Sequence, residues 1–362
     1  MKKFLWIIIA LLVVAMIAGC GQQGAKGKKL NIAFIYVGPI GDAGWTYAHN
    51  DGRLALEELD FVEKTVYVES VPEGAEAIRP ITQLAEAGND IIFTTSFGFM
   101  DPTLEVAEKY PNNVFMHCSG YKTSENMGAY FGRMYQAKYL AGIVAGSMSE
   151  AGKIGYVAPH PIPEVIRLIS AFTLGAQSVN PDAVVHIVWT NSWFDPAKEM
   201  DAANSMIELG CDVITQGADS AGPQQAAEKH GVWSLGYDSD MTKFAPTVHL
   251  TAPVWHWSVF YNQIAEQVYK GTWKSSNDWW GIETGLIGLS PYNDAVPQDV
   301  RDLVETTKQA IIDKEFHCFQ GPVYNQKGTL KVNEGEHLSD EQMLSMDWFV
   351  KGVIGSIPKS GK

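Results

Sequence analysis

The fold follows from LNIAFIYV at residues 30–37 and KIGYVA at residues 153–158, which open two similar series of β-rich and helical-period segments. Short apolar runs that alternate with amphipathic segments predict parallel sheets with crossover helices. The second series follows the first at a nearly constant offset, because Lys29 matches Lys153 and Lys109 matches Lys229. We therefore expect an α/β protein of two similar lobes, each a parallel sheet flanked by helices.

Composition narrows the class of protein further. The chain has 362 residues, of which 46% are hydrophobic and 19% charged, which is typical of a folded globular protein of about two domains. It carries 41 Asp and Glu against 27 Lys and Arg, for a formal net charge of −14. A surface of this sign repels a phosphate backbone, so we do not expect nucleic acid as a partner.

The N-terminus has the pattern of an export signal. Lys2 and Lys3 precede an apolar run over residues 4–18 that is too short for a membrane-spanning helix, and small residues lead to Cys20. The ending resembles a bacterial lipobox, which implies a signal peptide over residues 1–20, lipid attachment to Cys20 and a flexible tether over 21–29. An ordinary secretory signal with an incidental cysteine is the alternative. We expect an exported, membrane-anchored protein.

The remaining cysteines and the histidines give no sign of a metal or redox centre. Cys118, Cys211 and Cys318 are an odd number, so either three buried thiols or one disulfide with a free thiol results. Neither a CxxC nor an HExxH motif is present in the sequence. We therefore expect no metal and no cofactor.

The order of segments predicts how the lobes are joined. We expect three hinge crossings, near Tyr130, Leu250 and Trp280. The first lobe would comprise residues 30–130 and 250–279, and the second residues 131–249 and 280–362. Ligands of open parallel sheets bind beyond the carboxyl ends of the strands, so the site should lie in the cleft between the lobes.

Two tryptophans follow predicted strands at that cleft. Trp45 ends the turn GPIGDAGW at residues 38–45, and Trp193 lies in NSWFDP at residues 191–196, where Asp195 and Pro196 are typical of a helix start. Either indole could instead pack on its own sheet. If both face the cleft, they form a slot for a flat ligand, and a sugar could also stack there.

Polar residues at other strand ends would supply selectivity. We expect ligand contacts from Ser96 and Phe97, from Ser119 and Gly120, and from the carboxylates of Asp219 and Asp238. A carboxylate accepts hydrogen bonds from heterocycle N–H groups or sugar hydroxyls. For both aspartates, capping of the following turn is the alternative.

Several segments carry a resemblance to a known family: GDAGW at 41–45, TTSFGF at 94–99, YLAG at 139–142, SWFDP at 192–196 and GYDSD at 236–240. They are similar to the basic membrane lipoproteins, substrate-binding proteins of ABC importers with a type I periplasmic-binding-protein fold. The resemblance implies a monomer that captures a purine outside the membrane and delivers it to a permease. It also implies that Trp45 and Trp193 stack on the purine and that Asp238 is the aspartate that binds ribose in nucleoside-binding members.

The sequence departs from the nucleoside-binding members at two places. After Thr251, where those members have a lysine that contacts ribose, this chain has Trp255 and no lysine nearby, and Thr46 stands where they often have Asn. A bulky Trp255 would fill the ribose volume, so we expect a free nucleobase such as adenine. A purine nucleoside carrier and a ligand sensor remain alternatives, and the motifs of a nucleoside hydrolase or phosphorylase are missing from the sequence.

Overall fold

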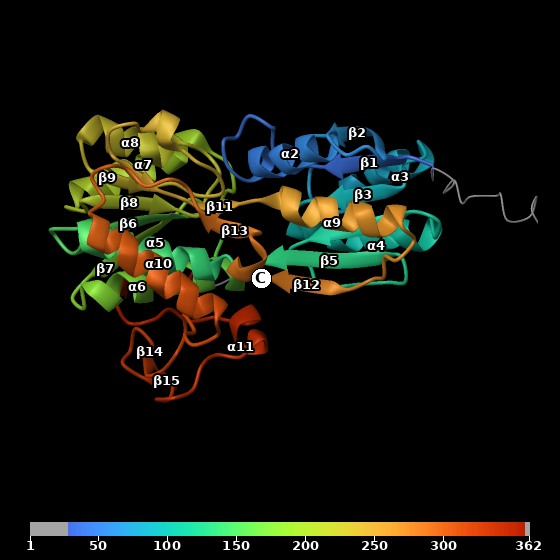
Figure 1. The fold of residues 1–362 in the computed structure, drawn as a ribbon. Coiled ribbons are helices and arrows are strands. Elements are labelled where there is room, and N and C mark those ends of the chain that lie inside the picture. The colour runs from blue at the N-terminus through green and yellow to red at the C-terminus, as the bar shows by residue number, and fades with distance from the viewer. Residues whose placement is uncertain (1–27, 359–362) are drawn as a thin grey trace, which may run out of the picture.

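The computed structural model describes residues 28–358, which form two lobes side by side (Figure 1). The signal peptide, Cys20 and nearly all of the expected tether lie outside the described residues. No helix within residues 28–358 combines the length and the apolar character needed to cross a bilayer.

The first lobe contains a six-stranded sheet in the order β12-β5-β4-β3-β1-β2, in which every pairing is parallel. Its central strands are buried on both faces, as apolar runs in a helix-covered sheet should be. The strands are β1 (Leu30–Ile35), β2 (Val62–Val68), β3 (Ile91–Thr94), β4 (Val114–Cys118), β5 (Met127–Gly132) and β12 (Asn277–Trp280). The helices of this lobe are α2 (Trp45–Leu56), α3 (Ile78–Glu86), α4 (Met100–Lys109) and α9 (Trp257–Tyr269).

The second lobe contains another all-parallel sheet, in the order β10-β9-β8-β6-β7-β16. Its strands are β6 (Lys153–Ala158), β7 (Val184–Trp189), β8 (Val213–Gln216), β9 (Trp233–Leu235), β10 (His249–Thr251) and β16 (Val353–Ile354). The helices are α5 (Tyr135–Met148), α6 (Pro163–Val179), α7 (Pro196–Glu208), α8 (Gly222–His230) and α10 (Gln298–Ile312).

The two sheets have the same internal order. Strands β2-β1-β3-β4-β5 of the first lobe correspond to β7-β6-β8-β9-β10 of the second, and each sheet gains one late strand at an edge. The repeat predicted from the sequence is thus confirmed as two lobes of one topology. Because all ten corresponding strands are parallel, each sheet presents its carboxyl ends at a single edge.

The chain passes between the sheets three times, after β5, after β10 and after β12. Strands β11 (Pro253–Trp255) and β13 (Ile287–Leu289) pair antiparallel between the two lobes (Figure 1). Helix α9 returns to the first lobe and packs closely on α2, where Trp257 and Tyr261 lie against Gly52. Three connections of this kind restrict relative motion of the lobes to a hinge.

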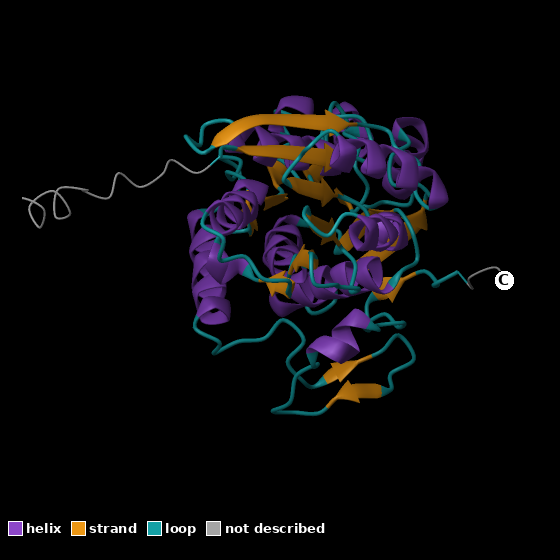
Figure 2. Cartoon of the chain, turned by 90° about the vertical axis from the view of Figure 1, so that its right-hand side faces the viewer, coloured by secondary structure: helices purple, strands orange, loops and turns teal. Residues whose placement is uncertain are grey.

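The C-terminal segment forms an appendage below the lobes that contains β14 (Val323–Tyr324), β15 (Leu330–Val332) and α11 (Asp340–Leu344) (Figure 2). Arg133, which follows β5 at the first crossing, donates two hydrogen bonds of 2.7 Å to the carboxylate of Asp340. The buried Arg167 of α6 donates to the carbonyl of Met343. The appendage is therefore attached both to the hinge and to the second lobe.

Local sequence signals explain several boundaries. Asp195 caps α7 by accepting a hydrogen bond from the backbone N–H of Lys198, as predicted. Residues 75–77 form a 3₁₀ turn and α3 begins only at Ile78, because Pro80 lacks an N–H and fits only a first turn. Cys118, Cys211 and Cys318 are buried free thiols, which was the first of the two alternatives.

Candidate functional site

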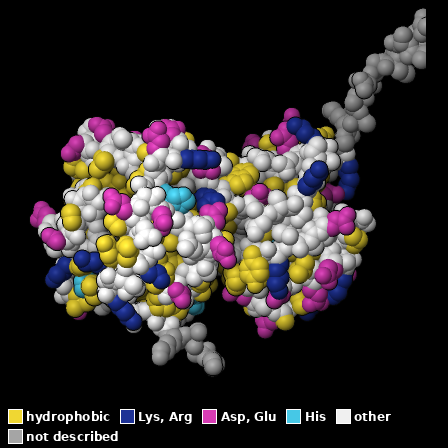
Figure 3. Space-filling view, turned by 90° about the horizontal axis from the view of Figure 1, so that it is seen from below, with side chains coloured by type: hydrophobic (Ala, Val, Ile, Leu, Met, Phe, Trp, Pro, Cys, Tyr) yellow, Lys and Arg dark blue, Asp and Glu magenta, His cyan; other side chains and the backbone are white. Residues whose placement is uncertain are grey.

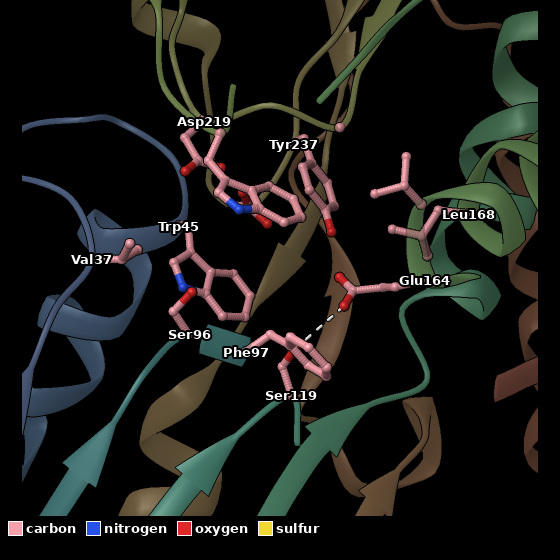
Figure 4. A pocket seen from close by; sticks show the side chains of 13 residues that line it. Val37, Trp45, Ser96, Phe97, Ser119, Glu164, Leu168, Asp219 and Tyr237 are labelled. Atoms are coloured by element: carbon pink, nitrogen blue, oxygen red, sulfur yellow. Dashed lines mark hydrogen bonds between the residues drawn. The ribbon is translucent and has the colours of Figure 1, made fainter. Parts of the chain in front are cut away.

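A pocket lies between the lobes at the carboxyl ends of their strands, and we call it the inner pocket. It contains about 500 Å³ of space between its lining atoms, part of it open to solvent. The first lobe contributes Val37, Trp45, Ser96, Phe97 and Ser119. The second lobe contributes Glu164, Val165, Leu168, Trp193, Gly217, Asp219, Tyr237 and Asp238. Figure 4 shows side chains of both lobes converging on this space.

The structure brings most of the sequence-predicted site residues together here. Those that line the inner pocket are Trp45, Ser96, Phe97, Ser119, Trp193, Asp219 and Asp238. Thr46, Gly120 and Trp255 do not line it. Thr46 is buried and its backbone N–H donates to Asp42, so it belongs to the turn that starts α2.

Trp45 and Trp193 give the inner pocket one indole from each lobe. The position of Trp45 is fixed, because its Nε1 donates to the carbonyl of Thr95 at 2.6 Å and its ring meets Trp255 edge-on. Trp193 precedes the capped start of α7, and the ring of His160 meets it at 4.9 Å. Both indoles therefore belong to stiff segments, which keeps the entropic cost of ordering them on a ligand small.

The backbone of Asp238, which follows β9 of the second sheet, adopts an unfavourable conformation. Its φ is 66°, in the left-handed region that Asp tolerates better than most residues. Ser119, after the corresponding part of the first sheet, has φ 73°. Positive φ in non-glycine residues costs free energy, and its presence on both walls of one pocket is typical of a functional site.

The carboxylate of Asp238 is only half satisfied. Trp255 Nε1 donates to its Oδ1 at 2.7 Å, whereas Oδ2 is buried and has no hydrogen-bond partner among the described residues. Burial raises the pKa of Asp238 well above its usual value, and the bond from Trp255 and the charge of Lys138 oppose that shift. A buried acceptor without a partner is costly, so a donor supplied by a ligand would stabilise the closed form.

Trp255 does not itself line the inner pocket. It lies against Asp238 and stacks on Trp257 at 4.5 Å between ring centroids. It contacts lining residues through the hydrogen bond to Asp238 and through the edge-on contact with Trp45. The sequence could not show this, because the strand β11 that carries Trp255 pairs with the distant β13.

Sequence reasoning missed Lys138 altogether. Its Nζ is buried beneath the pocket, donates to the carbonyl of Gln216 and lies 3.7 Å from the centroid of the Tyr237 ring. Burial lowers the pKa of Lys138, and the negative charge of Asp238 opposes that shift. A lysine inside the otherwise apolar helical run YQAKYLAGIVAG was the available signal.

Sequence reasoning also missed Glu164, at the start of α6. It lines the inner pocket and also a larger space, which we call the outer cavity, bounded among others by Gly120, Tyr121, Arg167 and Trp279. The outer cavity contains about 1530 Å³ of space, part of it open to solvent. Gly120 therefore belongs to the outer cavity instead of the inner pocket. In the space-filling view a furrow separates the lobes (Figure 3).

The lobes touch directly beside the inner pocket. A Cβ added to Gly44 of the first lobe would lie 2.3 Å from the carbonyl oxygen of Asp219 of the second lobe. The hydroxyl of Ser239 donates to the carbonyl of Ala43 across the same interface. Because of these contacts the two lobes are closed on each other, and a ligand in the inner pocket would contact both lobes.

Two lobes of one topology, joined by three crossings around the inner pocket, define the two-lobed α/β fold of type I periplasmic binding proteins. Residues 29–318 match the family model described as "Bmp: ABC transporter substrate-binding protein PnrA-like", and the chain belongs to this family. It is therefore an ABC-transporter substrate-binding protein, which works outside the cytoplasm with a small-molecule ligand and a permease.

Two curated relatives cover nearly the whole chain. A purine-binding protein of Brucella abortus (strain 2308) is 46% identical over 96% of this chain and all of that protein. A putative ABC transporter glucose-binding protein of Haloferax volcanii is 42% identical over 93% of this chain and 84% of that protein. The two relatives are named for different ligands, so family membership by itself does not specify the ligand of this chain.

Solved structures confirm the fold. An ABC transporter solute-binding protein from Aeropyrum pernix K1 superposes with a TM-score of 0.69 at 21% identity, over 81% of this chain and 94% of that one. Another, from Conexibacter woesei DSM 14684, has a TM-score of 0.66 at 21% identity, over 80% of this chain and 98% of that one.

Proposed function

We propose that the protein captures a purine nucleobase, with adenine as its ligand, and delivers it to an ABC permease. The observation that carries the proposal is the pairing, in one pocket between the lobes, of an indole from each lobe with Oδ2 of Asp238, which has no partner among residues 28–358. Indoles stack on flat heterocycles, and a carboxylate oxygen accepts from a ring N–H. The purine-binding relative from Brucella supports the same ligand class.

The position of Trp255 supports a base over a nucleoside. Trp255 and Trp257 fill the space behind Asp238, and Trp45 meets both rings edge-on. Among residues 28–358, no lysine lines the inner pocket, so a cation that could contact sugar hydroxyls is missing there. A ribose attached to the end of the base at Asp238 would have to displace packed indoles.

The carrier role involves no covalent step. In this proposal the protein acts as a monomer that is anchored through a lipid on Cys20, and residues 1–20 are its signal peptide. Its first lobe comprises residues 30–130 and 250–279, and its second lobe comprises residues 131–249 and 280–362. Exchanging Cys20 for Ala should leave the protein in the soluble fraction of cells that otherwise retain it on membranes. Retention of the variant on membranes would contradict the lipid anchor.

A sugar is the second candidate ligand, because the Haloferax relative is named as a putative glucose-binding protein and aromatic walls with carboxylates also suit a sugar. The deciding experiment is mass spectrometry of the ligand that co-purifies, together with thermal melting in adenine, adenosine and glucose. A tight ligand raises the melting temperature by mass action. We expect adenine to raise it most; equal or greater protection by adenosine or glucose would refute the nucleobase.

A further inference from the structure

Three carboxylates line the inner pocket, and they differ in what they already bind. Asp219 and Asp238 lie together at the strand ends of the second sheet, whereas Glu164 enters from the start of α6, on the far side of the pocket from Val37 in Figure 4. In the part of the chain that the structure describes, no Lys or Arg side chain lines the inner pocket beside these three carboxylates. A ligand held here must present hydrogen-bond donors in more than one direction.

Beside Asp238 the site offers one free hydrogen-bond acceptor, and that acceptor is buried. Oδ1 of Asp238 is occupied by Trp255, and Oδ2 is buried without a partner on a residue that is 0% exposed. Trp255 and Trp257 pack behind it. Because only this one acceptor is free and packed rings lie behind it, Oδ2 of Asp238 can bind a ring N–H of the ligand that carries no substituent.

At the other end the site is open and has spare acceptor capacity. Glu164 borders both the inner pocket and the outer cavity, together with Phe97 and Ser119. Its one side-chain hydrogen bond among the described residues comes from the Ser119 hydroxyl at 3.4 Å, a long and weak contact (Figure 4). A carboxylate with two nearly free oxygens suits an amino group.

We propose that Asp238 and Glu164 read opposite ends of the purine: Oδ2 of Asp238 accepts from a ring N–H, and Glu164 accepts from the exocyclic amino group, which points toward the outer cavity. This inference rests on the proposed function. A 6-aminopurine has donors at both ends, whereas a 6-oxopurine places a carbonyl oxygen against the Glu164 carboxylate. Glu164 is then the residue that selects amino over oxo purines, because two acceptors facing each other remain unpaired.

Burial supports this assignment. Desolvation raises the pKa of Glu164, although the neighbouring charge of Arg167 and the Ser119 hydroxyl oppose the shift. Desolvation also raises the pKa of Asp219, and the charge of Asp238 adds to it. Ligand donors would relieve part of this cost, which links recognition of the amino group to closure of the lobes.

The test is isothermal titration of the full mature protein with adenine, hypoxanthine, N6-methyladenine and 9-methyladenine. Wild-type protein should bind N6-methyladenine within about tenfold of adenine, since the methyl group enters the outer cavity. It should bind 9-methyladenine about 100-fold more weakly, because Oδ2 of Asp238 then loses its donor. Binding of 9-methyladenine as tight as that of N6-methyladenine would overturn the orientation without any variant.

Glu164→Gln then tests the residue itself. It should weaken adenine binding by about 10- to 100-fold and reduce the preference for adenine over hypoxanthine, because the carboxamide can donate to the oxo group. Glu105→Gln, on the exposed surface of α4, is the matched control and should change neither value. An unchanged preference in Glu164→Gln overturns the role of Glu164. If wild-type protein binds glucose and no purine, the proposed function itself fails, and this inference falls with it.

Discussion

Trp255 donates a 2.7 Å hydrogen bond from its Nε1 to Oδ1 of Asp238, and the two residues come from different strand ends of the closed structure. The bond holds the carboxylate so that one oxygen is satisfied and the other is left for the pocket. Trp255 is thereby a positioning residue that does not line the inner pocket. Neighbouring Trp257 stacks on it, and Nε1 of Trp257 has no partner among the described residues.

This pair provides a matched test of the hydrogen bond. Trp255→Phe removes the donor to a buried carboxylate, whereas Trp257→Phe removes a similar volume and no hydrogen bond. We expect Trp255→Phe to lower the free energy of unfolding by about 1–3 kcal/mol more than Trp257→Phe does. Urea unfolding of both variants measures the difference. Equal losses would mean that the bond contributes nothing to stability.

Closure should be blocked by a single methyl group at Gly44. A Cβ there meets the backbone of Asp219 in the other lobe, whereas a Cβ at Gly41 meets nothing within 4 Å. Gly44→Ala should therefore weaken ligand binding by about 1–3 kcal/mol, the usual cost of overpacking, and Gly41→Ala should not. Titration calorimetry measures the affinities, and small-angle scattering with ligand should show a more open molecule for Gly44→Ala. Full closure of that variant would contradict the contact.

Stacking should depend on Trp193. Trp193→Ala removes the indole that the second lobe contributes to the inner pocket, and we expect ligand affinity to fall by about 1–3 kcal/mol. Trp189→Ala is the control, because this indole packs on Phe349 and donates to the carbonyl of Ser356, away from the pocket. Equal affinities for both variants in titration calorimetry would remove Trp193 from the binding site.

Acid should destabilise the protein through His249, which is buried on β10. Burial lowers the pKa of His249 from 6.5 to about 4. The unfolded chain therefore binds the proton first, so stability is present above pH 6.5 and is lost as the pH falls toward 4. The full loss is about 3 kcal/mol, and most of it should be reached by pH 5.

His249→Gln should flatten this pH dependence. The comparison is urea unfolding at pH 7 and pH 5, with His230→Gln, an exposed residue at the end of α8, as control. Carboxyl groups whose pKa burial raises, such as Glu164, act in the opposite sense, so the difference between variants is the informative quantity. An unchanged slope in His249→Gln would contradict the assignment.

Much of the fold could be predicted because its signals are local. Hydrophobic period and turn residues repeat in both halves, and they correctly predicted two parallel sheets of the same kind. The cap at Asp195 was predictable because Asp195, Pro196 and the backbone N–H of Lys198, which donates to Asp195, lie within four residues of one another.

The candidate site was predictable in part for the same reason. Trp45, Trp193, Asp219 and Asp238 follow strand ends, and parallel strands bring their carboxyl ends to one edge whatever the packing. Gly120 and Thr46 each directly follow a residue that does line the inner pocket. Adjacent residues point in different directions, so a prediction made from a motif cannot separate them.

The sequence by itself determined the two-lobed parallel fold and the edge of each sheet at which the site would lie, because periodicity, turn chemistry and strand ends are properties of neighbouring residues. Only the tertiary structure decided that Trp255 donates to Asp238, that Lys138 lies over the ring of Tyr237 and that Glu164 lines the inner pocket. These contacts join β11, α5 and α6 to the ends of other elements. Their geometry is set by how helices pack on sheets and how the lobes close, which no local pattern specifies.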